Sequence, residues 1–72
     1  MTNNIESERR RLGMTQGELA TKVGRTRATI AKWESDPLAI TGTNLVMLAD
    51  LFQCSIDYLL GLTAERTPKA AV

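Results

Sequence analysis

The stretch TQGELATKVGRTRATIAKWE, residues 15–34, contains two short helical patterns that are separated by a glycine. Thr15 and Glu18 have the spacing of a capping box, in which each side chain accepts a hydrogen bond from a backbone N–H at the start of the helix. We therefore expect a helix over residues 16–23. Gly24 follows directly and can adopt the left-handed conformation that commonly ends a helix.

A second helix is expected almost at once, capped by Thr26 and running to about Glu34. The break at the glycine brings the two helices together at a steep angle, and the second one turns Ile30 and Trp33 toward the core. Its outward face then carries four neighbouring residues, which are Arg27, Ala28, Ala31 and Lys32. A presented helix with two cations fits the major groove of double-stranded DNA.

Helix start and stop signals recur along the rest of the chain, whereas the sustained alternation of a strand is missing. The first helix is expected to begin near Asn3, with Glu6 completing a capping box. Ile5 and Leu12 would form its inward line, and Gly13 would end it.

Residues 35–42, SDPLAITG, indicate a loop because they include a proline and a glycine. Either Thr41 or Thr43 caps a fourth helix, whose core stripe is Leu45, Leu48, Ala49 and Phe52. Ser55 caps a short fifth helix over residues 56–60, which Gly61 closes. The predicted fold class is therefore all-α, a compact bundle of five short helices. Residues 1–61 would form one domain, followed by a flexible C-terminal tail over residues 62–72.

The composition excludes several classes of function. The chain has 72 residues, no histidine and one cysteine, Cys54, so a disulfide within the chain, a zinc site and histidine-based catalysis are excluded. No apolar run approaches the roughly 20 residues of a membrane helix, and the N-terminus lacks the features of a signal peptide. We expect a soluble, cytoplasmic protein that is not an enzyme, uses no metal or cofactor, and buries its thiol.

Charge is divided unevenly along the chain. Residues 1–32 contain seven basic and three acidic side chains, whereas residues 33–64 contain four acidic side chains and no basic one. This distribution favours a polarised molecule with one face suited to a polyanion.

The joint pattern from Leu12 to Glu34, L-x-M-T-Q-x-E-L-A-x-K-V-G-x-T-x-x-x-I-x-x-W-E, resembles the helix-turn-helix family of phage Cro and repressor proteins. The resemblance continues through NLVMLADLFQCSIDYLLG, residues 44–61, and covers roughly residues 4–61. It implies a five-helix domain, with the helix-turn-helix formed by helices two and three, that binds operator DNA, usually as a twofold dimer. The expected function is a sequence-specific transcriptional regulator, a repressor of a phage, prophage or similar element. The alternative is a protein-interaction module such as an antitoxin or adaptor.

The resemblance also implies roles for residues of the third helix. Arg27 would read guanine in the major groove or, alternatively, clamp a phosphate. Ala28 would contact a thymine methyl group or be merely permissive, and Ala31 would give the bases clearance. For Lys32, guanine and phosphate contacts remain equally open.

A further group is expected to contact DNA phosphates, and it comprises Gln16, Arg25, Thr26, Thr43, Asn44, Arg10 and Arg11. Gln16 would use the partial positive charge at the start of its helix, unless it is an ordinary first-turn residue. The two threonines and Asn44 could equally serve only as helix caps. Several relatives carry basic residues before helix four, where this chain has only Asp36, and the arginines would compensate.

Two structural contacts complete the expectations. Arg9 and Glu34 match an ion pair that fastens helix one to helix three in related repressors, with two independent solvated charges as the alternative. The apolar fifth helix would form the twofold contact of a homodimer, and the residues assigned to it are Ile56, Tyr58 and Leu59.

Overall fold

The computed structural model describes residues 3–66, which form five α-helices and one short 3₁₀ helix. The elements are α1 (Ile5–Arg11), α2 (Gln16–Val23), α3 (Arg27–Ser35), η1 (Pro37–Ala39), α4 (Gly42–Phe52) and α5 (Ile56–Leu59). The predicted all-α bundle of five short helices is confirmed. Among the described residues, no helix has the length and apolar character needed to cross a membrane.

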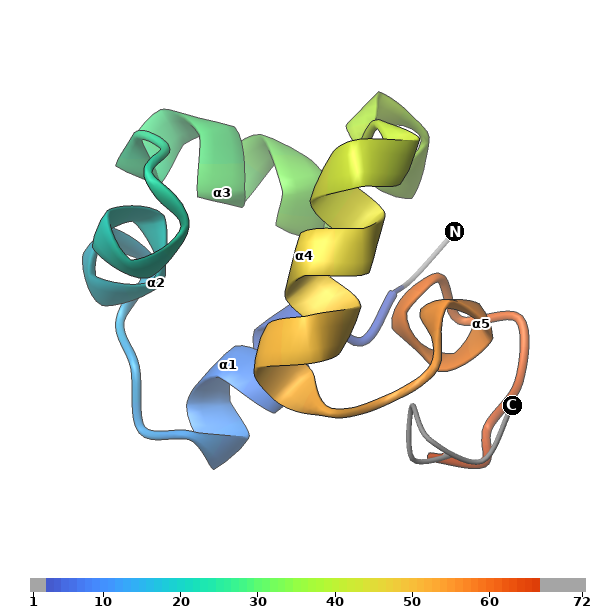
Figure 1. Cartoon of the computed structure of the whole chain (residues 1–72). Coiled ribbons are helices and arrows are strands. Elements are labelled where there is room, and N and C mark those ends of the chain that lie inside the picture. The colour runs from blue at the N-terminus through green and yellow to red at the C-terminus, as the bar shows by residue number, and fades with distance from the viewer. Residues whose placement is uncertain (1–2, 67–72) are drawn as a thin grey trace.

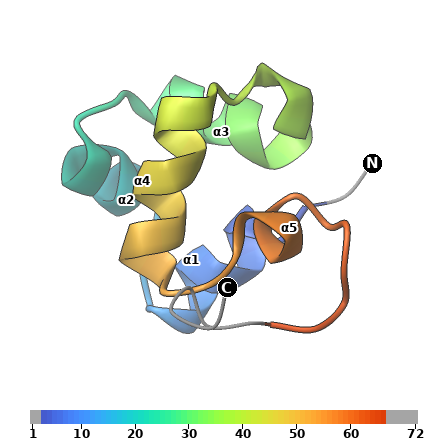
Figure 2. The ribbon, with the colours of Figure 1, turned by 45° about the vertical axis from the view of Figure 1, so that its right-hand side comes forward.

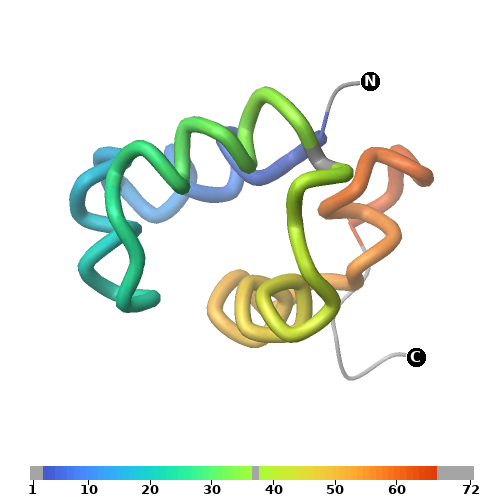
Figure 3. Tube along the Cα trace, turned by 90° about the horizontal axis from the view of Figure 1, so that it is seen from above, coloured from blue at the N-terminus to red at the C-terminus, as the bar shows by residue number. Residues whose placement is uncertain are grey.

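The four other α-helices are arranged around α4. Figure 1 shows α3 near the first turn of α4, α1 near its last turn, and α2 and α5 on opposite sides. The rotated view keeps this order, with α2 directly followed by α3 across a tight turn (Figure 2). Viewed from above, α1 and α3 lie on the same side of α4 (Figure 3). The second and third helices therefore sit at one side of the fold with α3 near its surface.

One core unites the five α-helices. Every α-helix contributes at least one buried apolar residue, and α4 contributes Leu48, Ala49 and Phe52. From α2 and α3 the buried residues are those predicted, namely Leu19, Ala20, Val23, Ile30 and Trp33. Cys54 is fully buried as expected, whereas Leu45 of the predicted stripe is only partly buried.

The predicted helix boundaries around the turn are confirmed. The backbone N–H of Glu18 donates to Thr15 Oγ1 at 3.1 Å, and the N–H of Thr15 donates to Glu18 Oε1 at 2.9 Å. Gly24 ends α2 with φ of 70°, a conformation that glycine adopts without the steric cost of a Cβ atom. Thr26 then caps α3 by accepting from the N–H of Thr29.

The start of α1 predicted near Asn3 is correct to within one residue, and Asn3 Oδ1 accepts a hydrogen bond from the N–H of Ile5, but the predicted capping box does not form. The N-cap is Asn4, and its side chain makes no capping hydrogen bond, while Glu6 pairs with Arg10 instead of closing a capping box. Leu12 was also misplaced: it follows the last residue of α1 and is 42% exposed. A seven-residue spacing aligns two residues on one face only while the helix continues, and α1 ends at Arg11.

The segment predicted as a loop is partly helical. It contains η1, and Gly42 is the first residue of α4 rather than part of the connection. The alternative left open for the cap is settled for Thr41, whose side chain accepts from the N–H of Asn44. Ser55 caps α5 as predicted, and Leu60 lies just beyond that helix as its C-cap.

A buried carboxylate on α1 gathers two arginines. Glu8, with a side chain only 3% exposed, accepts hydrogen bonds from Arg11 at 3.0 Å and from Arg66 at 3.0–3.1 Å. Both guanidinium groups also donate to the carbonyl of Phe52 at the end of α4. The described part of the segment after α5 is therefore attached to α1 and α4. The predicted domain boundary at residue 61 stays a prediction, and residues 67–72 of the predicted tail lie outside the described residues.

The electrostatics of this cluster favour the charged form of the carboxylate. Burial by itself raises the pKa of Glu8, but the hydrogen bonds from Arg66 and Arg11 outweigh it and leave the pKa below its usual value. The neighbouring Cys54 responds oppositely, since burial and the Glu8 charge both raise the pKa of its thiol.

We predict that Glu8→Gln lowers the free energy of unfolding by about 1–3 kcal/mol, because two arginines lose a charged acceptor. Native-state labelling of Cys54 should also rise roughly fivefold or more as the surrounding segment opens. A lowered pKa stabilises the fold above the unfolded value of about 4.3, and this contribution is lost as the pH falls through the folded value. The difference in the free energy of unfolding between the unmodified protein and Glu8→Gln should therefore disappear at acidic pH.

The matched control is Glu6→Gln on the same helix, since the Glu6–Arg10 pair is exposed and should contribute at most about 1 kcal/mol. Denaturant titrations across pH and thiol-labelling rates provide the measurements. Equal behaviour of the two variants would contradict a structural role for the Glu8 cluster.

Candidate nucleic-acid interface

The outward face of α3 presents the four residues predicted from the sequence. Arg27, Ala28, Ala31 and Lys32 are all exposed, and they lie opposite the buried Ile30 and Trp33 on the same helix. Because the side chains of Ala28 and Ala31 are short, the centre of this face protrudes less than its two ends. A cation stands near each end of it, so the helix offers one long polar side chain at its start and another in its last turn.

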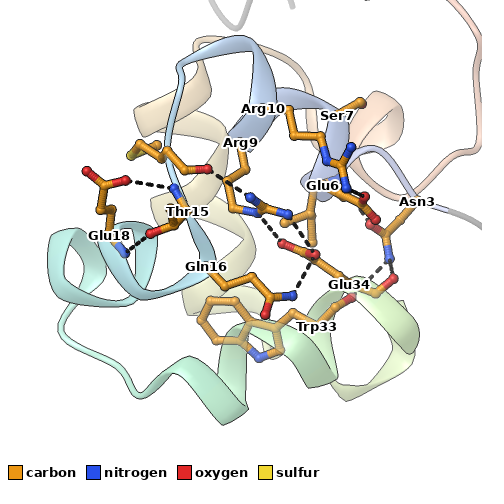
Figure 4. Close-up of polar contacts among 12 residues, drawn as sticks. Asn3, Glu6, Ser7, Arg9, Arg10, Thr15, Gln16, Glu18, Trp33 and Glu34 are labelled. Atoms are coloured by element: carbon orange, nitrogen blue, oxygen red, sulfur yellow. Dashed lines mark hydrogen bonds and ion pairs between the residues drawn. The ribbon is translucent and has the colours of Figure 1, made fainter.

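A buried ion pair holds this helix from behind. Arg9 Nε lies 2.7 Å from Glu34 Oε2, and the two side chains are only 10% and 7% exposed. Arg9 also donates to the carbonyl of Met14 at 2.8 Å. Figure 4 shows its guanidinium facing the carboxylate of Glu34. The hydrogen bond to Glu34 raises the pKa of Arg9, so its guanidinium is charged at every physiological pH. α1 and the segment before α2 are thereby tied to the end of α3.

Gln16 joins the same carboxylate. Gln16 is the first residue of α2, and its side-chain Nε2 donates to Glu34 Oε1 at 3.0 Å (Figure 4). The side-chain amide therefore points toward the Arg9–Glu34 pair. A shallow groove beside it is also lined by Arg10, Gly17 and Arg27. The first-turn N–H groups of α2 have no acceptor within the helix and carry the positive end of the helix dipole. The groove is also lined by Arg9 and by the carboxylates of Glu6 and Glu34, which pair with Arg10 and Arg9. Its unpaired positive groups are therefore Arg27 and the N-terminus of α2, and these suit an anion.

A second polar cluster links the α2–α3 turn to α4. Arg25 Nη2 donates to Asn44 Oδ1 at 3.0 Å, which joins the turn to the first turn of α4. Because Asn44 is neutral, this contact leaves the charge of Arg25 uncompensated. Thr26 follows Arg25 in the sequence, is exposed and caps α3. Thr43 precedes Asn44, is also exposed, and is not the cap of α4.

The two arginines of α1 that were expected to contact phosphates, Arg10 and Arg11, lie in different surroundings. Arg10 lines the groove and pairs with Glu6 on the surface, where its side chain is 71% exposed. Arg11 instead bonds to Glu8 and to the carbonyl of Phe52, the end of α4 that lies away from α3 in Figure 1. Its assignment to the phosphate group stays a prediction, and Arg11 lies on a different face from Arg10 because successive residues of a helix are rotated by about 100°.

The residues predicted for a dimer contact also differ from one another. Ile56 and Tyr58 are partly buried and retain some exposed surface on α5. Leu59 is 0% exposed and belongs to the core of the chain itself, so it is removed from the expected interface. Leu59 is the residue of α5 that is buried.

One set of contacts near the site has no signal in the sequence. Asn3 Nδ2 donates to the carbonyls of Trp33 and Glu34, and Asn4 Nδ2 donates to the carbonyl of Tyr58. The partners are about 30 or more residues away, and no local pattern marks them. Within residues 3–66 there is no cluster of three or more potential metal ligands.

The arrangement of a tight α2–glycine–α3 unit, an exposed α3 face and a buried clamp behind it defines a helix-turn-helix domain. The helix-turn-helix family model matches residues 5–59, and the chain belongs to that family. The resemblance to Cro and repressor proteins is thereby confirmed.

Two relatives share substantial identity with the chain. Repressor protein C2 of Salmonella phage P22 is 37% identical over 60 residues, which cover 83% of this chain and 28% of that protein. The uncharacterized HTH-type transcriptional regulator YobD of Bacillus subtilis strain 168 is 36% identical over 56 residues, covering 78% of this chain and 50% of the relative. The chain thus spans half or less of the length of these two proteins. No solved structure matches it significantly.

We predict that Glu34→Gln destabilises the fold by about 3–5 kcal/mol, the range for a broken buried ion pair, because it leaves the Arg9 charge without a counterion. Glu6→Gln again serves as the control, since it makes the same chemical change in an exposed pair. Thermal melts of the two variants provide the comparison. A melt of Glu34→Gln that matches the control would show that the pair does not fasten α3.

Proposed function

We propose that this protein is a sequence-specific regulator of transcription that binds double-stranded DNA with α3 in the major groove. The observation that carries the proposal is the exposed face of Arg27, Ala28, Ala31 and Lys32 on a helix that is clamped from behind. An α-helix fits the width of the major groove, and a rigidly held one loses little conformational entropy on binding. Family membership and the repressor relative support the same function. Such a regulator works in the cytoplasm, associated with the nucleoid when it is bound.

The DNA bases would be read by the four residues of the outward α3 face, with the two cations at its ends. Arg27 can donate two parallel hydrogen bonds to O6 and N7 of guanine, which is the most common specific contact to DNA. Ala28 offers a methyl group to thymine, and Ala31 leaves room for the base edges. Lys32 reaches guanine or a phosphate from the last turn.

Two phosphate clamps would flank the recognition helix. The first comprises Arg10 and the start of α2 at Gln16, where the exposed Glu6 contact of Arg10 is weak enough to be exchanged for a phosphate. The second comprises Arg25, Thr26, Thr43 and Asn44, where Arg25 already bridges to α4. Phosphate contacts fix the orientation of the domain, and base contacts then select the sequence.

We further propose that two copies bind a pseudo-palindromic operator. Ile56 and Tyr58 leave apolar surface on α5, and a twofold contact there would present one α3 to each half-site. Such dimers place their recognition helices about 34–36 Å apart, which is one turn of DNA. The small size of α5 favours a weak dimer that is completed on the operator.

We predict that Arg27→Ala weakens binding to the best operator by about 1–3 kcal/mol and relaxes the preference at one base pair. Lys22→Ala removes the same charge from an exposed position outside the proposed interface and should leave that preference intact. Selection from random DNA, followed by titrations at several salt concentrations, measures both effects.

The other outcomes of this experiment are equally informative. A uniform loss on all sequences with a shallower salt dependence would assign Arg27 to a phosphate. Binding that neither variant affects, or that is insensitive to salt, would overturn the DNA-binding face and favour the protein-interaction alternative.

A separate prediction concerns assembly. Ile56→Asp should abolish cooperative binding to the two half-sites while retaining the binding of a single half-site, because it places a charge in the proposed apolar contact. Leu12→Asp introduces the same charge at an exposed apolar residue at the far end of α1 and should preserve cooperativity. Binding isotherms are compared with circular dichroism melts, since Ile56 also touches the core. Non-cooperative binding by the unmodified protein would contradict the dimer.

A further inference from the structure

Two adjacent asparagines near the N-terminus join the ends of two different helices. Asn3 Nδ2 donates to the carbonyls of Trp33 at 3.0 Å and Glu34 at 3.2 Å, both in the last turn of α3. Asn4 donates to α5 twice, through Nδ2 to the carbonyl of Tyr58 at 2.6 Å and through its backbone N–H to the carbonyl of Leu59 at 2.9 Å. We call Asn3 and Asn4 the asparagine clip. Figure 4 shows Asn3 at the end of α3, beside the Glu34 backbone.

At α3 the clip satisfies carbonyl groups that the helix cannot satisfy itself. The last carbonyls of a helix have no N–H partner within it, and they carry the negative end of its dipole. For Trp33 the deficit is fixed by the sequence, because the residue four positions later is Pro37, which has no N–H. Asn3 supplies the missing donor from a distant part of the chain.

The clip has little freedom of its own. The amide of Asn3 is engaged at both ends, since its Oδ1 accepts from the N–H of Ile5 at 3.0 Å. Ile5 begins α1 and is fully buried. Two consecutive residues therefore connect the ends of α3 and α5 to the start of α1 without an intervening flexible linker.

We propose that the asparagine clip sets the position of α3 relative to α5 and thereby the half-site spacing that the dimer accepts. This inference rests on the proposed function, in which α3 reads the groove and α5 forms the twofold contact. A displacement of α3 relative to α5 changes the separation of the two recognition helices twice, once through each subunit. Since successive base pairs are 3.4 Å apart along the helix axis, about 1.7 Å per subunit corresponds to a whole base pair of spacing.

The test compares Asn3→Ala, Asn4→Ala and the double variant on a series of operators. The operators contain the selected half-sites with the natural spacing, one base pair more or one base pair fewer. The unmodified protein should prefer its natural spacing strongly. In the variants this preference ratio should fall at least about threefold, the effect of losing one ordinary hydrogen bond, while affinity for an isolated half-site stays unchanged.

A control within the same segment separates placement from general loss of contacts. Ser7→Ala also removes a polar group, but the Ser7 hydroxyl is exposed and donates locally, to the carbonyl of Asn4, and not to a carbonyl of α3 or α5. It should retain the spacing preference. If the double variant does not fold, the single variants carry the test, because each retains the contact to one of the two helices.

Three results would overturn the inference, and they are distinguishable. Folded variants that keep the original spacing ratio would show that other contacts place α3. An equal loss on all operators would make the clip a general stabiliser. An unmodified protein that binds without any dependence on spacing would refute the proposed dimer, and the inference with it.

Discussion

The buried ion pair between Arg9 and Glu34 is the constraint on which the presentation of α3 depends. Burying two charges is costly, and their attraction offsets that cost only when the geometry is good and the remaining hydrogen-bonding groups are satisfied. Here Arg9 also donates to Met14, and Glu34 also accepts from Gln16. One carboxylate on α3 therefore contacts both α1 and α2. Because each contact needs the others for correct placement, the arrangement favours one position of α3 over a range of similar ones.

Short helices require such fixed ends. α2 has eight residues and α3 has nine, lengths at which an isolated helix is marginal in water, so the caps and the core must define them. The capping box at Thr15, the positive φ of Gly24 and the cap at Thr26 act within a few residues of one another. Together they fix where α2 ends and α3 begins. The ion pair and Asn3 then hold the opposite end of α3.

The range of the interactions explains what the sequence could predict. The boundaries of α2 and the caps of α3 and α5 were predicted correctly because donor and acceptor are about three residues apart. At the start of α1 the bond from the Ile5 N–H to Asn3 is local, but the bonds of the Asn3 amide nitrogen to carbonyls 30 and 31 residues away were not predicted. The position of Arg11 likewise depends on Phe52, at a separation of 41 residues. Local chemistry specified the helices, but the orientation of several polar side chains depended on packing between them.

The same distinction clarifies the uneven charge of the sequence. Composition alone treats the basic residues of the first half as equivalent, but the structure divides them by their partners. On α1, the three arginines form ion pairs with Glu34, Glu6 and Glu8. By contrast, Arg25, Arg27 and Lys32 form no ion pair with any carboxylate of residues 3–66. Lys22 on α2 is likewise unpaired, so three of the four cations of residues 3–32 without an ion pair lie on the turn and on α3. A polyanion would therefore be attracted toward the outward face of α3.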